Sequence, residues 1–326
     1  MLPLIGGRPA SLESLGWSGF FADQLGDDER DLVPARIDEV HRGRLTGLAQ
    51  TGPIEVVLPA RSDTGEYAVG DWVLVDPVTS LLHLRLGRKS VLQRPAEGRR
   101  PTQLVAANLD TLFIVASCNA DFNVARLERY LALANDAETN PVLVLTKADT
   151  AEDAGAFERQ AAALQRGLDV VVLDARAPTA AKALAPWCGP GLTVALVGSS
   201  GVGKSTLVNA LIGIGRAQQQ TGAIRESDAK GRHVTTSRSL HPMAGGGWVV
   251  DTPGMRSLQV KDIAQGIDTL FAEITELAPL CKFRNCTHDH EPGCAVRAAV
   301  AAGTVDPDRL ARWRKLQAEN VQGARR

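Results

Sequence analysis

The chain has 326 residues and a formal net charge of −1, with 44% hydrophobic and 22% charged residues. This length exceeds that of one ordinary domain and the composition is globular, so we expect several domains. The net charge lacks the strong positive excess that would mark the whole molecule as a nucleic-acid binder. No apolar run approaches the ~20 residues that span a bilayer, and the amino terminus lacks the features of a secretory signal. We therefore expect no membrane contact, and a cytoplasmic monomer without disulfides.

The first region with a readable pattern is 33–98, because residues 1–32 contain no motif with a chemical meaning. Here short apolar stretches alternate with turn residues, which predicts a five-stranded β-barrel of the oligonucleotide-binding (OB) type. The apolar stretches are residues 37–40, 44–48, 54–58, 71–75, 82–86 and 90–92. We expect Trp72 to pack in the core of this barrel.

The basic side chains of the barrel have two interpretations. They are Arg36, Arg42, Arg44, Arg61, Arg85, Arg88 and Lys89. Together they would suit a surface that follows an RNA backbone by shape and charge. The alternative is a solvated face on a structural barrel, because aromatic side chains that would stack on bases are scarce.

Two almost continuously apolar segments, 110–116 and 141–145, flank a stretch with helical spacing at 124–138. This order predicts a parallel α/β sheet that binds its ligand at the carboxyl ends of the strands. Thr146, Lys147 and Asp149 follow the second strand. The carboxylate of Asp149 can accept two hydrogen bonds that guanine offers and adenine does not, while the stem of Lys147 lies along the base. An exposed polar loop is the alternative.

A further apolar strand at 170–173 is followed by Asp174 and Ala175. In a GTPase this position holds a Ser-Ala loop whose backbone N–H meets the guanine oxygen. We assign Asp174 and Ala175 to this base loop, although Asp174 departs from the usual serine.

The strongest motif is the phosphate-binding loop at 198–205, with the pattern Gly, four spacers, Gly, Lys and Ser. An apolar strand at 193–197 leads into it, and a helix at 204–212 follows, with Gly213 placed to end it. Backbone N–H groups of this loop should surround the phosphates, Lys204 should contact the β- and γ-phosphates, and Ser205 should ligate Mg²⁺. The expected contact residues are Gly198, Ser199, Ser200, Gly201, Val202, Gly203, Lys204, Ser205 and Thr206. A structural glycine turn is the alternative.

The base-reading motif lies ahead of the phosphate loop, whereas ordinary GTPases have the reverse order. The sequence therefore predicts a circularly permuted P-loop GTPase domain, which we place at residues 99–262.

Two switch segments should complete the nucleotide site. After an apolar strand, Asp251 can hold magnesium through water, and the N–H of Gly254 can bind the γ-phosphate. In the polar stretch 230–237, we favour Thr235 over Thr236 as the hydroxyl that completes the magnesium shell. Met255 occupies the place of the glutamine that positions water in many GTPases. A thioether cannot do this, and His233 is the nearest candidate to replace it, although it could instead only hydrogen-bond the switch backbone.

Cys281, Cys286, His288 and Cys294 lie within fourteen residues. Three thiolates and one imidazole at this spacing predict a structural zinc site in a mainly α-helical module at 263–326, with His290 as a possible substitute ligand. Cys118 and Cys188 stand alone and should be packed thiols. The helix predicted at 307–320 carries Arg309, Arg312, Arg314 and Lys315, and it either presents a basic face to RNA or packs on the GTPase domain with solvated arginines.

A small barrel, a permuted GTPase domain and a Cys, Cys, His, Cys module in this order resemble the bacterial ribosome small-subunit-dependent GTPase A family. The segment 129–131 (Arg, Tyr, Leu) and the switch segment 231–233 (Gly, Arg, His) add to the resemblance. It implies a GTPase that is activated by the small ribosomal subunit, contacts its rRNA late in maturation, and checks or releases other assembly factors. The family's suspected catalytic histidine corresponds to His233. Thr146 for Asn, Val234 for Thr and Asp174 depart from the family pattern.

Two other functions fit parts of the sequence. Met255 would suit a nucleotide-gated RNA- or protein-binding module that needs little hydrolysis. An ATP-using P-loop kinase would require Asp149 to be incidental.

Overall fold

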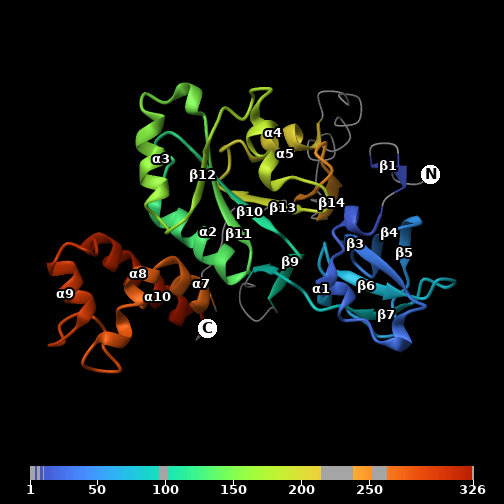
Figure 1. Ribbon diagram of the computed structural model, residues 1–326, viewed down its shortest axis with the longest axis horizontal. Coiled ribbons are helices and arrows are strands. Elements are labelled where there is room, and N and C mark those ends of the chain that lie inside the picture. Colours follow the sequence, from blue (N-terminus) through green and yellow to red (C-terminus); the bar gives the residue numbers. More distant parts are fainter. Residues whose placement is uncertain are drawn as a thin grey trace.

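The computed structural model describes residues 4–5, 8–9, 11–94, 102–213, 238–251 and 263–324. Figure 1 shows a small barrel, an α/β core and a C-terminal helical module arranged along the long axis of the molecule, with the α/β core between the other two. Within the described residues, no helix has the length and apolar character that a membrane crossing requires.

The barrel is built from strands β3 (Val33–His41), β4 (Arg44–Ala49), β5 (Gly52–Val56), β6 (Trp72–Val75) and β7 (Leu82–Arg85). β3 pairs with β4 and β6, β4 pairs with β5, and β6 pairs with β7, all antiparallel. A parallel bridge from Val57 to Leu81 closes the circle between the third and fifth strands. This pairing is that of an OB barrel and confirms the predicted architecture.

The segment 90–92 was wrongly included among the barrel stretches. It begins β8 (Val91–Arg94), which pairs with β9 (Gln103–Ala107) in a separate two-stranded sheet. The strand β9 is not predictable from the sequence, because five residues with little alternation of apolar and polar side chains carry a weak strand signal.

The α/β core has the parallel strand order β12 (Asp169–Val172), β11 (Asn140–Thr146), β10 (Thr111–Ser117), β13 (Thr193–Gly198) and β15 (Trp248–Asp251). The antiparallel strand β14 (Ser239–Pro242) extends this sheet and meets β3 at one residue pair. Successive side chains of β10 point to opposite faces of the sheet and pack in two separate hydrophobic cores. Ile114 packs on the face covered by α2 (Val124–Asp136). Phe113 packs on the face covered by α4 (Ala180–Ala183) and α5 (Lys204–Ile212). α3 (Ala154–Ala162) lies on the α2 side (Figure 1).

The segment ahead of the barrel, which the sequence left without a role, anchors the barrel to the α/β core. Leu15 is fully buried, and its carbonyl accepts a hydrogen bond of 2.5 Å from Nη1 of Arg36, whose Nη2 donates to Oγ1 of Thr193 in β13 at 2.7 Å. Arg36 is 1% exposed, and burial lowers its pKa to about 10. Arg36 is therefore a buried tether between two units and not part of an RNA-facing surface. The predicted packing of Trp72 is confirmed, since it is 1% exposed.

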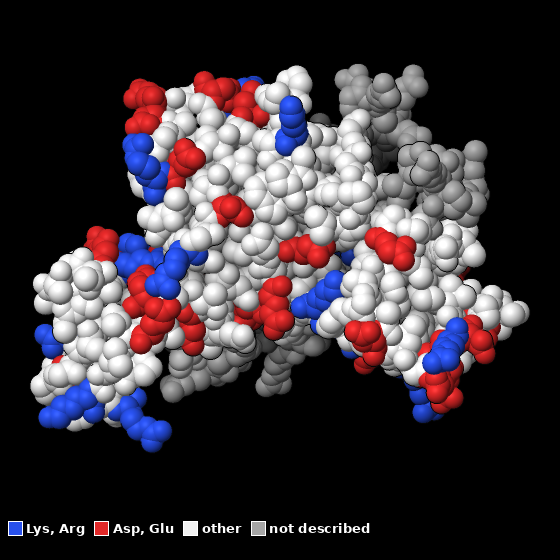
Figure 2. Space-filling view, viewed as in Figure 1, with Lys and Arg blue, Asp and Glu red and all other residues white. Residues whose placement is uncertain are grey.

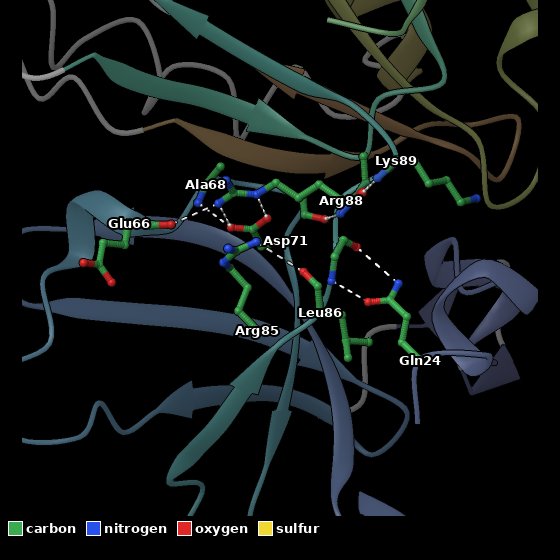
Figure 3. Close-up of polar contacts among 11 residues, drawn as sticks. Gln24, Glu66, Ala68, Asp71, Arg85, Leu86, Arg88 and Lys89 are labelled. Atoms are coloured by element: carbon green, nitrogen blue, oxygen red, sulfur yellow. Dashed lines mark hydrogen bonds and ion pairs between the residues drawn. The ribbon is translucent and has the colours of Figure 1, made fainter. Parts of the chain in front are cut away.

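An ion pair within the barrel removes Arg88 from the proposed basic surface. Its guanidinium pairs with the buried carboxylate of Asp71, with Nε to Oδ1 at 2.6 Å and Nη2 to Oδ2 at 2.7 Å (Figure 3). Just before it in the chain, the backbone N–H of Gly87 donates to Oε1 of Gln24. These bonds fix the connection that leads from β7 toward β8. Exposed arginines that remain on the barrel are Arg42, Arg44 and Arg61.

The C-terminal module contains α7 (Ala264–Leu270), α8 (Ala272–Thr275), α9 (Ala295–Ala301) and α10 (Pro307–Ala324). Gly266 permits α7 to lie directly on α2, because a Cβ at this position would come within 1.9 Å of the carbonyl oxygen of Ala132. The mainly α-helical prediction is confirmed.

The basic side chains of α10 pair with the GTPase core. Arg309 Nη1 and Arg312 Nε both contact Oε1 of the buried Glu128 in α2, at 2.8 and 2.9 Å. Arg309 Nε also contacts Glu273 at 2.7 Å, and its guanidinium lies 4.1 Å from the ring centroid of Phe271. The interpretation of α10 as a packed helix is therefore right, but Arg309 is not solvated, being 7% exposed.

Replacing Glu128 with glutamine should lower the free energy of unfolding by about 3 kcal/mol, because Arg309 and Arg312 would then remain buried or half-buried without their shared carboxylate. Chemical denaturation followed by fluorescence measures this change. The matched control is Glu276→Gln, which breaks an exposed pair with Arg166 at 3.2 Å and should change stability little. Equal effects of the two substitutions would contradict the importance of the buried pair.

Candidate functional site

The parallel sheet brings the predicted nucleotide motifs to one edge. Ser117 is level with Thr146 across β10 and β11, and Val115 is level with Gly198 across β10 and β13. Asp251 ends β15, the neighbour of β13 on its other side. The base-reading motif, the phosphate loop and the switch acid Asp251 therefore meet at the carboxyl ends of adjacent strands, where sheets of this type bind ligands.

The phosphate loop has a backbone that only glycine can adopt at its ends. Gly198 has φ 142°, and a Cβ there would lie 2.2 Å from the carbonyl oxygen of Val115. Gly203, with φ 100°, immediately precedes the first turn of α5. Lys204 Nζ donates to the carbonyl oxygen of Gly198 at 2.8 Å, so the ammonium lies over the loop. Ser200, Gly201 and Ser205 are exposed, while Val202 is buried and anchors the loop.

Thr146 joins the base-reading motif to the phosphate loop. Its Oγ1 lies 2.6 Å from the carbonyl oxygen of Val202 and 3.1 Å from that of Ala116, and the residue is fully buried. The hydroxyl is thus occupied by backbone contacts. Thr146 can therefore hold the two loops together.

The base loops lie against each other through a residue that the sequence analysis missed. Arg176 Nη2 contacts Oδ2 of Asp149 at 2.9 Å, and the backbone N–H of Arg176 donates to Oδ1 of Asp174 at 2.9 Å. Lys147 has φ 57°, a left-handed backbone that turns the chain out of β11. Ala175 is 7% exposed. The signal that could have indicated Arg176 was the unusual carboxylate at Asp174, because a nearby cation offsets its repulsion with Asp149.

The switch segments lie mostly outside the described residues. Asp251 is half-buried and level with Ser239 of β14. His233, Thr235, Gly254 and Met255 fall in undescribed stretches, so their assignments remain predictions.

The predicted metal ligands converge in the C-terminal module. The candidate ligand atoms of Cys281, Cys286, His288 and Cys294 all lie within 4.8 Å of one another. The Sγ atoms of Cys281 and Cys294 are 3.8 Å apart, and His288 Nδ1 lies 3.5 and 3.4 Å from them. Tetrahedral coordination at usual zinc distances would place two sulfurs about 3.8 Å apart and a sulfur and nitrogen about 3.5 Å apart. The donor set and its spacing therefore fit zinc.

The surrounding chain holds the metal ligands in place. Cys294 caps α9, its Sγ accepting from the backbone N–H of Arg297 at 3.4 Å. Arg314 of α10 donates to the carbonyl oxygen of His288 and contacts Asp289 at 3.3 Å. His290 does not join the cluster, because its side chain is 82% exposed and faces Asp289.

A phosphate loop preceded in the chain by an acidic base-reading motif, on one edge of a parallel sheet, defines a circularly permuted P-loop GTPase. A family model described as RsgA GTPase matches residues 85–261. The small ribosomal subunit biogenesis GTPase RsgA of Mesorhizobium japonicum is 69% identical over 95% of this chain and 90% of that protein. The protein of the same name from Opitutus terrae is 40% identical over 97% and 91%. The chain belongs to the RsgA GTPase family and is therefore a hydrolase acting on GTP.

Solved structures agree with this fold. The crystal structure of YjeQ from Thermotoga maritima has a TM-score of 0.68 at 25% identity, over 89% of this chain and 99% of that one. The structure of YloQ, which is described as a circularly permuted GTPase, has a TM-score of 0.63 at 24% identity, over 91% and 98%.

Proposed function

We propose that this chain is a GTP-dependent assembly factor that binds the small ribosomal subunit in the cytoplasm. It acts as a monomer in the late maturation of the subunit. Stimulated by the subunit, it hydrolyses GTP to GDP and phosphate. The observation that carries this proposal is the 69% identity, over 95% of the chain, to a protein named for small ribosomal subunit biogenesis. Its functional units would be residues 33–98, 99–262 and 263–326.

The residues that we propose for nucleotide binding follow from their places at the sheet edge. Asp149 would accept hydrogen bonds from guanine, with Lys147 along the base and the backbone of Ala175 at the guanine oxygen. The loop from Gly198 to Thr206 would surround the phosphates, with Lys204 on the β- and γ-phosphates. Mg²⁺ would be held by Ser205, Thr235 and Asp251, and would neutralise charge that develops on the phosphates.

We further propose one zinc ion on Cys281, Cys286, His288 and Cys294. When bound, zinc would cross-link the loop 281–294, which has little apolar core of its own. The module that it organises follows the switch acid Asp251 in the chain and packs on the GTPase core, where Gly266 of α7 lies against Ala132 of α2 and Arg309 of α10 pairs with Glu128 of α2 at 2.8 Å. These contacts support a role of the zinc module in sensing the nucleotide.

Contact with rRNA would use the exposed basic side chains that the ion pairs leave available. Arg42, Arg44 and Arg61 are exposed on the barrel, and Lys282, Arg284 and Arg297 are exposed on the zinc module. Figure 2 shows Lys and Arg side chains at the outer end of the C-terminal module, and acidic side chains over the α3 side of the core. The overall charge of −1 suits shape-dependent contacts at the two ends of the molecule better than a continuous basic face.

The second candidate function, a nucleotide-gated binding module with little required hydrolysis, is favoured by Met255. Replacing His233 with alanine separates the two. We expect subunit-stimulated GTP turnover to fall about 10²-fold or more with unchanged GTP affinity, because a general base or water-positioning group would be lost. Single-turnover hydrolysis with purified small subunits measures this. The control is His290→Ala, an exposed histidine outside the metal cluster. Full complementation of a deletion strain by His233→Ala would instead support the binding module.

A further inference from the structure

Arg176 links the two acidic residues of the base loops. Its Nη2 lies 2.9 Å from Oδ2 of Asp149, and its Nε lies 3.6 Å from Oδ1 of Asp174. The arginine side chain is 73% exposed, whereas those of Asp149 and Asp174 are 33% and 29% exposed. An exposed cation thus covers two half-buried carboxylates beside the predicted guanine site.

The geometry leaves Asp149 able to bind guanine while it is paired. A carboxylate has about four acceptor positions on two oxygens. The contact with Arg176 uses one position, on Oδ2. Oδ1 and the remaining position on Oδ2 correspond to the two donors of guanine, the ring N–H and the exocyclic amine. Arg176 therefore does not need to leave Asp149 when the base enters.

The charges explain why such a support is needed in this chain. Where a GTPase base loop usually has serine, Asp174 adds a second carboxylate close enough to Asp149 for one guanidinium to contact both. Two neighbouring carboxylates repel each other. A guanidinium between them offsets this repulsion and restricts the rotation of both side chains.

We propose that Arg176 is a positioning residue for guanine selection, which holds the carboxylate of Asp149 in its base-accepting orientation and compensates the charge of Asp174. The inference rests on the proposed base-reading role of Asp149. It makes Asp174 and Arg176 a matched pair: Asp174 without Arg176 is unfavourable for guanine binding, and the presence of Arg176 offsets this effect.

The test is the dissociation constant of a fluorescent GDP analogue, measured by titration with the full chain and competed with unlabelled GDP, IDP and ADP. We expect Arg176→Ala to weaken GDP binding roughly two- to fivefold, the range that exposed charge pairs support. In Asp174→Ser/Arg176→Ala, most of that loss should be recovered. The loss should be smaller for IDP, which lacks the exocyclic amine, and the midpoint of thermal unfolding should not move.

The control is Arg159→Ala, because Arg159 is also 73% exposed and paired with an aspartate, Asp153 at 3.5 Å, but belongs to α3 and not to the base loops. GDP binding that is unchanged or tighter in Arg176→Ala would overturn the proposal, as would an equal loss in the double variant. Failure of the underlying function is distinguishable: in that case the wild-type protein would not prefer GDP over ADP, and Asp149→Ala would have no effect.

Discussion

Replacing Lys204 with alanine should reduce GTP turnover by about 10²-fold or more, comparable to the loss of a donor that stabilises charge in a transition state. Lys204 begins α5, and its Nζ lies over the phosphate loop, 2.8 Å from the carbonyl oxygen of Gly198. Alanine removes the ammonium that would face the β- and γ-phosphates, but it favours the helix, so the loop and α5 should keep their structure. Turnover of radiolabelled GTP in the presence of small subunits, together with thermal unfolding, separates a catalytic loss from misfolding.

The matched control is Lys182→Ala. This lysine is exposed on α4 in the same α/β core and lies outside the phosphate loop. Its loss should leave turnover unchanged. If Lys204→Ala retained turnover near the wild-type level, the assignment of residues 198–205 as the phosphate-binding loop would be wrong.

Removing the metal should unfold the zinc module while the α/β core stays folded. Structural zinc sites contribute on the order of 10 kcal/mol or more to the folding of small domains. In this chain the ligand atoms of Cys281, Cys286, His288 and Cys294 already lie at zinc-compatible separations. We expect metal analysis to find one zinc per chain. Chelation of the metal, or the substitution Cys286→Ser, should remove the hydrogen-exchange protection of residues 281–301.

Thiol alkylation tests the same site by another route. With metal bound, the five cysteines should react slowly; after chelation, Cys281, Cys286 and Cys294 should react quickly. Cys118 and Cys188 should stay slow, because both are buried and burial raises the pKa of Cys188 to about 12. The control His290→Ala should keep its zinc. A chain that contains no zinc, or a zinc-free chain with unchanged protection, would contradict the metal site.

The sequence was most informative where a function depends on local spacing. The phosphate loop, its flanking strand and helix, and the four metal ligands each lie within a short segment, so their residue types and spacing determine the structure directly. The barrel strands were predictable for the same reason, since alternating apolar residues mark each one. The strand β9 lacked such a pattern and became visible only through its pairing with β8.

The contacts that tie the units together could not be predicted, because they join residues far apart in the chain. Arg36 and Arg88 have the same side chain as the exposed Arg42 and Arg44, and nothing in their local sequence marks Arg36 as a buried tether or Arg88 as the partner of a buried carboxylate. Arg36 is buried because Leu15 and Thr193 converge on it, and Arg88 is held by Asp71 (Figure 3). Likewise, the arginines of α10 acquired their role from Glu128 of α2, which the sequence analysis had not considered.

The arrangement gives the permuted order a structural meaning. The base-reading half of the core follows the barrel in the chain. The phosphate-binding half continues past the switch acid Asp251 to α7, which contacts α2 and α10. The zinc module is therefore attached both to the switch by the chain and to α2 by ion pairs.

The rate of GTP hydrolysis with and without purified small ribosomal subunits tests the central claim most directly. The purified chain should hydrolyse GTP slowly, subunits should accelerate it, Lys204→Ala should abolish the acceleration, and ATP should be inert. A rate that does not change when small subunits are added would contradict the proposed partner, and equal hydrolysis of ATP would contradict the base-reading role of Asp149.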